Sequence, residues 1–282
     1  RKWLRISSPD DIIEHRHDYS KWSQVPYCLA VHLSLGSIFA FSVYNGSLIT
    51  SLGVVAPAPG DWTISDILPV FGLTMSTFGL SSAILGRLGF YEKSGPRLCC
   101  LLGGFSHLTG FAIASFGVQV HSLPLVYLGC GVFGGAAMGV AYVPAVAILL
   151  RWFPKEKGLA SGLAVMGYGA GGMVAAPTAQ TLLGIFKKPP QYLGPSSEIT
   201  TIVQEGKTFV EMSGESVQVV SARASELAVT FPELAEGVYV VGTGSSGVAE
   251  TFACMGILYS TTILASSLQF RLPPPRKKGG YP

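Results

Sequence analysis

Residues 98–150 read LCCLLGGFSHLTGFAIASFGVQVHSLPLVYLGCGVFGGAAMGVAYVPAVAILL, and these 53 residues include no Asp, Glu, Lys or Arg. A helix rises about 1.5 Å per residue, so crossing about 30 Å of hydrocarbon takes about 20 residues. The stretch is therefore too long for one membrane helix. It divides at 119–124, where Gln119, His121, Ser122 and Pro124 interrupt the apolar run. We predict two consecutive membrane helices, residues 98–119 and 124–150.

Four further charge-free blocks flank this stretch. They hold 39 residues before Asp61, 20 before Arg87, 29 before Lys187 and 20 before Arg271. Each is long enough to cross a bilayer. The predicted fold class is therefore an all-α membrane protein with six transmembrane helices, at residues 27–55, 66–87, 98–119, 124–150, 158–186 and 248–270.

The overall composition supports this class. The 282 residues are 49% hydrophobic and 12% charged, with a mean hydropathy of +0.45, whereas soluble domains are about 25% charged. This nearly excludes a soluble enzyme, and a net charge of +3 gives no reason to expect a nucleic-acid partner. The five cysteines fall in or beside apolar blocks without a CxxC motif or a Cys/His cluster, so neither a metal site nor a cofactor is expected. The expected partner is the lipid bilayer.

The distribution of basic residues predicts the orientation. With the N-terminus in the cytoplasm, 15 of the 19 Lys and Arg residues fall on the cytoplasmic side, as the positive-inside rule requires. Both termini are therefore expected to be cytoplasmic. The predicted segments are a cytoplasmic N-terminal segment (1–24), helices one to five (25–186), a long external loop (187–247), helix six (248–270) and the start of a middle cytoplasmic loop (271–282).

The long fifth loop has its own composition. Between Lys187 and Glu250 it holds eight glutamates and four basic residues. Its β-branched and aromatic runs at 208–212, 216–220 and 238–241 read as short strands. We expect a small external subdomain there.

Two glycine-rich stretches match the dinucleotide-binding fingerprint, at 167–172 and 242–247. The first lies inside an apolar helical run. The second follows a predicted strand, but the fingerprint also needs an acidic residue about 20 positions on. The 20 residues after Glu250 contain no acid and form a predicted membrane span, so a hinge into the sixth helix is the better interpretation.

The loop between the second and third spans contains a recognisable pattern. Glu92, Lys93, Gly95 and Arg97 follow the order acid, base, glycine, base. This resembles the cytoplasmic loop signature of the major facilitator superfamily, except that Leu88 replaces the leading glycine. In that family such a loop forms part of a conformational lock between two helix bundles, and the resemblance implies that role for these four residues.

A second loop makes the resemblance more specific. Residues 151–162, RWFPKEKGLASG, are similar to the loop after the fourth helix in oxalate/formate antiporter-like (monocarboxylate-type) members of the superfamily. Residues 36–44, 134–142 and 167–177 resemble their first, fourth and fifth helices. The resemblance covers residues 22–186 and 237–272 but not the core of the external loop.

The resemblance implies the N-terminal half of a transporter that moves small organic anions such as carboxylates by alternating access. The C-terminal six-helix half is expected but absent from the sequence, so the chain reads as a fragment or a truncated gene model. A six-helix membrane scaffold or sensor that does not transport is the alternative, and the long acidic loop favours it.

Side chains within the spans suggest where a solute passes. No Asp, Glu, Lys or Arg lies in a span interior; His32 and His107 are the intraspan ionisable residues, and a buried neutral histidine is the simpler interpretation of each. Aromatic or polar groups on otherwise small-residue helices are typical of an apolar cavity. Substrate-pathway candidates are Phe39, Tyr44, Asn45, Tyr142 and Tyr168. Glycines spaced for close helix approach are Gly131, Gly135, Gly139, Gly162, Gly167 and Gly171.

Overall fold

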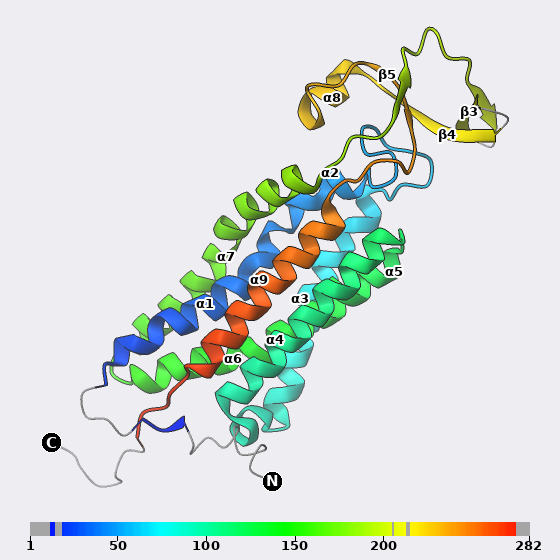
Figure 1. Cartoon of the computed structure of the whole chain (residues 1–282). Coiled ribbons are helices and arrows are strands. Elements are labelled where there is room, and N and C mark those ends of the chain that lie inside the picture. Colours follow the sequence, from blue (N-terminus) through cyan, green and yellow to red (C-terminus); the bar gives the residue numbers. More distant parts are fainter. Residues whose placement is uncertain (1–11, 15–18, 205, 213–214, 275–282) are drawn as a thin grey trace.

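The computed structural model describes residues 12–14, 19–204, 206–212 and 215–274. Most of the predicted cytoplasmic ends, 1–11 and 275–282, lie outside the described residues. Within the described part, six helical segments are long and apolar enough to span a membrane, and they pack side by side as one elongated bundle (Figure 1). The predicted membrane class and its six spans are confirmed.

Two of the spans are built from several helical types. The first comprises η3 (Lys21–Gln24), α1 (Val25–Leu35), the 3₁₀ stretch η4 (Gly36–Tyr44) and α2 (Asn45–Leu48). The fourth comprises α5 (Leu123–Val126), the π-helical stretch η5 (Tyr127–Gly134) and α6 (Gly135–Trp152). The other four are continuous helices: α3 (Ile64–Arg87), α4 (Phe90–Gln119), α7 (Lys157–Phe186) and α9 (Val248–Leu268).

The largest differences from the predicted boundaries lie at the end of the first span and the start of the third. The first span ends at Leu48 and not at residue 55, because the apolar residues that follow, including Val55 and Ala56, are buried in a loop against the sheet described below. The third span begins at Phe90 and not at residue 98. The predicted loop is thus largely helical, with one interruption at Gly95 (φ 73°, ψ 161°), a backbone conformation that favours glycine.

The long fifth loop folds into a five-stranded antiparallel sheet, so the helical fold class also carries a β-structure. The strands are β1 (Tyr192–Gly194), β2 (Ile202–Gln204), β3 (Lys207–Met212), β4 (Glu215–Ala222) and β5 (Gly237–Val240), with helix α8 (Ala224–Thr230) between β4 and β5. The sheet order is β1-β5-β4-β3-β2. The three predicted strands correspond to β3, β4 and β5.

The sheet shares its core with the loop between the first and second spans. Val220 and Tyr239 of the sheet are buried together with Val55, Ala56 and Ala58 of that loop. The backbone N–H of Gly242 donates to the Leu52 carbonyl at 3.2 Å. Together the sheet and loop form a layer over one end of the bundle (Figure 1).

Glycines on η5 and α6 bring the fourth span against α3. A Cβ at Gly131 would lie 2.5 Å from Leu73, one at Gly135 2.5 Å from the Thr74 carbonyl oxygen, and one at Gly139 1.9 Å from the Ser81 hydroxyl. No side chain fits at such distances, so the two helices approach this closely only with bare backbone at these positions.

Glycines on α7 contact the first span in the same way. A Cβ at Gly167 would lie 2.9 Å from Leu29, and one at Gly171 would lie 2.5 Å from the Gly36 backbone. Gly162 is a correction: a Cβ there would meet no atom within 4 Å. Gly162 is exposed and lies on a different face of α7 from Ala160 and Ala164, which are buried in one cluster with Val25 and Cys28 of the first span.

Candidate functional site

Five aromatic rings from four helical segments form a continuous cluster in the bundle. The ring of Tyr168 on α7 lies 5.0 Å from Phe39 on η4 and 5.1 Å from Tyr142 on α6. Phe78 on α3 lies 5.5 Å from Tyr142, and Phe71 on α3 lies 6.4 Å from Phe39. These centroid distances are those of favourable edge or offset contacts. We call these five residues the aromatic cluster.

The cluster lies at an open face of the bundle. Phe39 is 45% exposed and Phe71 36% exposed, whereas Tyr142, Tyr168 and Phe78 are half-buried. The Tyr168 hydroxyl is buried and finds no hydrogen-bond partner among the described residues. The cluster thus combines exposed aromatic surface with one buried, unpaired hydroxyl, and none of its members carries a charge.

Close helix packing holds the cluster together. A Cβ on Gly36 would lie 1.9 Å from the backbone oxygen of Tyr168, so α7 lies directly on the first span one turn from Phe39. His32 on α1 supports the cluster from within, because its fully buried ring lies 5.0 Å from Tyr142. The Nδ1 atom of His32 is 2.7 Å from the Cys28 carbonyl oxygen.

Three of the five pathway candidates meet in this cluster, and Tyr44 and Asn45 lie elsewhere. Tyr44 is 5% exposed, and its ring packs 4.8 Å from Phe252 on α9, inside the bundle. A 3₁₀ helix has 3.0 residues per turn, so Tyr44, five positions after Phe39, points to a different side. Asn45 begins α2, and its Oδ1 atom is buried without a hydrogen-bond partner among the described residues.

Sequence reasoning missed Phe71 and Phe78. Their spacing of seven residues places both on one face of α3, and this periodicity was the available signal. It indicates a shared face but does not identify the helices that this face meets.

A second, smaller feature lies inside the bundle. A cavity of about 40 Å³ is bordered by η4, η5, α4 and α9. Its polar lining includes Tyr44, His107 and Tyr259; the Nδ1 atom of buried His107 is 3.3 Å from the Ser260 hydroxyl. A space of this size can hold ordered water. Both irregular stretches, η4 and η5, border it, and such stretches often mark functional positions in helices.

Glu92, Lys93, Gly95 and Arg97, which we call the lock loop, lie near the start of α4. This is the end of the bundle away from the sheet. Glu92 is exposed, and the Lys93 ammonium donates to the Leu88 carbonyl at 3.2 Å, at the end of α3. Arg97 donates to the Phe270 carbonyl at 3.1 Å. Glu92 also borders a cavity of about 110 Å³ together with Arg151, on α6.

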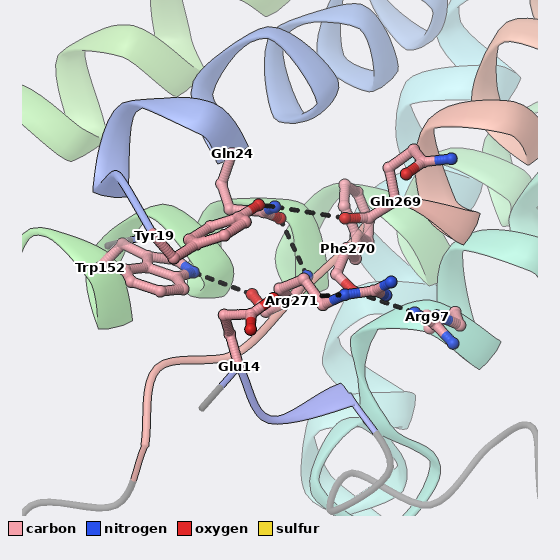
Figure 2. A network of polar contacts seen from close by, with 8 residues as sticks. All are labelled: Glu14, Tyr19, Gln24, Arg97, Trp152, Gln269, Phe270 and Arg271. Atoms are coloured by element: carbon pink, nitrogen blue, oxygen red, sulfur yellow. Dashed lines mark hydrogen bonds and ion pairs between the residues drawn. The ribbon is translucent and has the colours of Figure 1, made fainter. Parts of the chain in front are cut away.

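Arg97 belongs to a polar network around the segment that follows α9 (Figure 2). Gln24, fully buried, donates to the Gln269 carbonyl at 3.2 Å and accepts from the Arg271 backbone N–H at 3.0 Å. Trp152 donates to the Arg271 carbonyl at 2.8 Å. The chain leaving the sixth span is therefore held by the beginnings of the first and third spans and the end of the fourth.

Comparison with known proteins assigns the family. The family model described as Major Facilitator Superfamily matches residues 27–189, more than half of the chain. The chain belongs to the Major Facilitator Superfamily. The matched region contains the aromatic cluster and the lock loop, but not strands β1 to β5.

Several curated relatives in this superfamily are similar over part of the chain. An uncharacterised MFS-type transporter of Escherichia coli, YhjX, is 27% identical over 55% of the chain and 35% of its own length. Human monocarboxylate transporter 11 is 29% identical over 52% of the chain and 31% of its own length. The oxalate:formate antiporter of Oxalobacter formigenes is 35% identical over 34% of the chain and 22% of its own length. The matched part of the chain spans a third or less of most of these relatives.

The superfamily and the names of these relatives indicate a transporter and not an enzyme. The six apolar helices and the family match indicate a membrane protein that crosses the bilayer several times. No cluster of three or more His, Cys, Asp or Glu side chains suited to a metal ion occurs in the described part of the chain.

Proposed function

We propose that this chain forms the first six-helix half of a transporter that moves small organic anions, such as carboxylates, by alternating access. The oxalate and monocarboxylate names of the relatives support the substrate class. Alternating access requires two bundles that move against one another around a site near the middle of the membrane. The second bundle is a C-terminal six-helix half.

The aromatic cluster is the observation that carries the proposal. It brings rings from the first, second, fourth and fifth spans to one face in the middle of the bundle, where a second bundle would close a pathway. Ring edges carry partial positive charge and offer a weakly polar surface to a carboxylate. Because the cluster has no basic residue, charge recognition falls to the second half.

The surface around the cluster fits this arrangement. The second and fifth spans expose large apolar side chains that a partner bundle or lipid must cover. On α3 these are Ile64, Leu68, Phe71, Leu73, Leu80 and Ile84, and on α7 they are Leu159, Val165, Met166, Met173, Val174 and Ile185.

We also propose that the end opposite the sheet is cytoplasmic. Lys21 at the start of the first span pairs with Glu156, between α6 and α7, at 2.9 Å. Arg87, Lys93 and Arg151 lie at the same end of their helices. This end therefore gathers basic residues from four segments, as the positive-inside rule expects of the cytoplasmic side, and the sheet would then be external.

For the lock loop we propose a contact that differs between the two states of the transporter. Glu92 shares a cavity with Arg151 in this structure, so its carboxylate can exchange between Arg151 and a group on the second half. Arg97 of the same loop donates to the Phe270 carbonyl within its own bundle in this structure.

The external sheet favours a second candidate function. Its five strands have their own buried residues and make up a folded layer, which suits a membrane scaffold or sensor. Such a protein would need no open aromatic face.

Uptake by proteoliposomes tests the proposal. The purified chain is reconstituted alone and together with the C-terminal six-helix half of the oxalate:formate antiporter, and uptake of radiolabelled oxalate, formate and lactate is measured. We expect uptake with both halves and none with the chain alone. Loss of that uptake in Phe39→Ala and Tyr142→Ala variants that still assemble supports a pathway at the cluster. If both variants retain full uptake, the cluster is not the pathway. Strong uptake by the chain alone would exclude a half-transporter.

A further inference from the structure

His121 joins two loops at the sheet-bearing end of the bundle. It lies in the turn between α4 and α5. Its backbone φ is 50°, in the left-handed region that residues other than glycine rarely adopt. Its ring stacks on Trp62, from the loop between the first and second spans, with 4.4 Å between centroids and 10° between planes. The contact holds a strained turn against a second loop.

Both ring nitrogens of His121 have partners in that second loop. Nδ1 lies 3.1 Å from the Ser51 hydroxyl, and Nε2 lies 2.9 Å from the Gly60 carbonyl oxygen. The Ser51 hydroxyl in turn donates to the Asp61 carboxylate at 3.1 Å.

The proton count of this network follows from its chemistry. The Gly60 carbonyl oxygen only accepts, so Nε2 must carry a proton. An ionised carboxylate also only accepts, so the single Ser51 proton is used on Asp61. Ser51 can then only accept from His121, and Nδ1 must carry a proton as well. Every bond in the network is made when His121 is a doubly protonated imidazolium.

Asp61 also binds the backbone of its own loop. Its carboxylate accepts from the backbone N–H groups of Leu52 at 2.7 Å, Gly53 at 3.2 Å and Ala58 at 2.8 Å. The same carboxylate thereby fixes the loop backbone that presents Ser51 and Gly60.

We propose that His121 is a proton-binding site, and that its protonation fastens the loop of residues 49–63 to the turn between α4 and α5. A neutral imidazole has one donor and one acceptor, so it must release either Gly60 or Ser51, unless Ser51 turns away from Asp61. The network is therefore complete at acidic pH and loses a bond as pH rises.

Asp61 is the one Asp, Glu, Lys, Arg or His in the loop of residues 49–63. Asp61 faces His121 through Ser51, and the neighbours of His121 in its turn, Val120 and Ser122, are uncharged. His121 is partly exposed, so protons from solvent reach it directly. His32 and His107, in contrast, are buried within the bundle.

Protonation of His121 should also affect the sheet. Residues 49–63 also supply Val55, Ala56 and Ala58 to the core beneath β4 and β5. A bond between this loop and the α4–α5 turn therefore links the sheet layer to the third and fourth spans. Acid on the sheet-bearing side should make this layer more rigid.

The experiment uses the full chain in lipid nanodiscs. In ¹⁵N-histidine NMR spectra, the signals absent from His121→Gln are assigned to His121. At about pH 5.5 both ring nitrogens should show attached protons, and at about pH 8 one should not. A single protonated nitrogen at both pH values, or no change between them, would overturn the proposal.

Trp62 provides an independent readout. A protonated imidazole stacked on an indole quenches its fluorescence, so the emission of Trp62 should rise from about pH 5.5 to about pH 8. Trp62→Phe identifies the signal, and His121→Gln should abolish its pH dependence while Gln keeps a donor for Gly60. His107→Gln is the matched control and should retain the step. A step that persists in His121→Gln would contradict the assignment.

Discussion

The rings of Tyr142 and Tyr168 meet edge to face, with 5.1 Å between centroids and 68° between planes. They belong to successive membrane helices, α6 and α7, which are joined by a loop of only four residues, 153–156. This pair lies at the centre of the aromatic cluster, with Phe39 and Phe78 on either side. The hydroxyl of Tyr168 makes no hydrogen bond with the described residues, and that property can be tested without a transport assay.

Tyr168→Phe should leave the bundle as stable as before or more stable. It removes a buried hydroxyl that has no partner, and such a group destabilises the folded state by about 1–3 kcal/mol. Thermal unfolding of the chain in detergent measures the effect. Tyr239→Phe is the matched control, because the Tyr239 hydroxyl donates to the Ala235 carbonyl; it should lower stability by about 1 kcal/mol. A clear loss of stability in Tyr168→Phe would mean that this hydroxyl has a partner.

Gly171→Ala should separate α7 from the first span. A Cβ at Gly171 would lie 2.5 Å from the Gly36 backbone and from the Leu33 carbonyl oxygen, and neither can move without moving a helix. Overpacking of this kind costs about 1–3 kcal/mol. Gly169→Ala is the control on the same helix, because a Cβ there meets no atom within 4 Å. It should be neutral or slightly stabilising. Equal unfolding temperatures for the two variants would contradict this packing.

Gln24→Ala should loosen the segment that follows α9. Its side chain donates to Tyr19 at 2.5 Å and to Gln269 at 3.2 Å, and it accepts from Arg271 at 3.0 Å. Removal leaves partly buried backbone groups unpaired, at a cost of about 1 kcal/mol. Hydrogen exchange of residues 266–274 should become faster, whereas Gln119→Ala, an exposed glutamine at the end of α4, should change nothing. Unaltered exchange in Gln24→Ala would show that the network does not hold this segment.

The spans could be predicted because lipid imposes a strong constraint on sequence. Long runs without charge identified all six helices, and runs of β-branched and aromatic residues identified β3, β4 and β5. The end of the first span could not be predicted, because Val55 and Ala56 have the composition of a membrane segment. They are instead buried against Tyr239, from a strand more than 180 residues later in the chain.

The candidate site could be predicted only in part, for a similar reason. Phe39, Tyr142 and Tyr168 stood out as aromatics on small-residue helices, and the structure brings them together. Tyr44 stood out equally, but it lies at the end of a 3₁₀ stretch that turns its ring toward Phe252. Amino-acid composition does not reveal a local change from α-helix to 3₁₀ helix. The contact between Phe78 and Tyr142 could not be predicted either, because it depends on how two helices pack.

Labelling of an introduced cysteine tests the orientation. Thr200→Cys places an exposed thiol in the loop before β2, whereas Cys28, Cys99, Cys100 and Cys130 are buried. In intact cells a membrane-impermeant maleimide should label Thr200→Cys from outside. The unsubstituted chain is the control for background at Cys254, which is half-buried. Labelling that appears only after the membrane is permeabilised would place the sheet on the cytoplasmic side.

Glu92→Gln should shift the balance between the two states of the assembled transporter. Its carboxylate is exposed and borders the same cavity as Arg151, and an exposed ion pair contributes about 0–1 kcal/mol. The population ratio should therefore change by about fivefold at most, with expression unaltered. Uptake rates of the chain assembled with a second six-helix half measure the shift, and Glu198→Gln, an exposed glutamate before β2, is the control. Arg97→Gln should behave differently and lower stability, because Arg97 holds the Phe270 carbonyl within its own bundle. If Glu92→Gln matches Glu198→Gln in uptake rate, Glu92 has no part in a conformational lock.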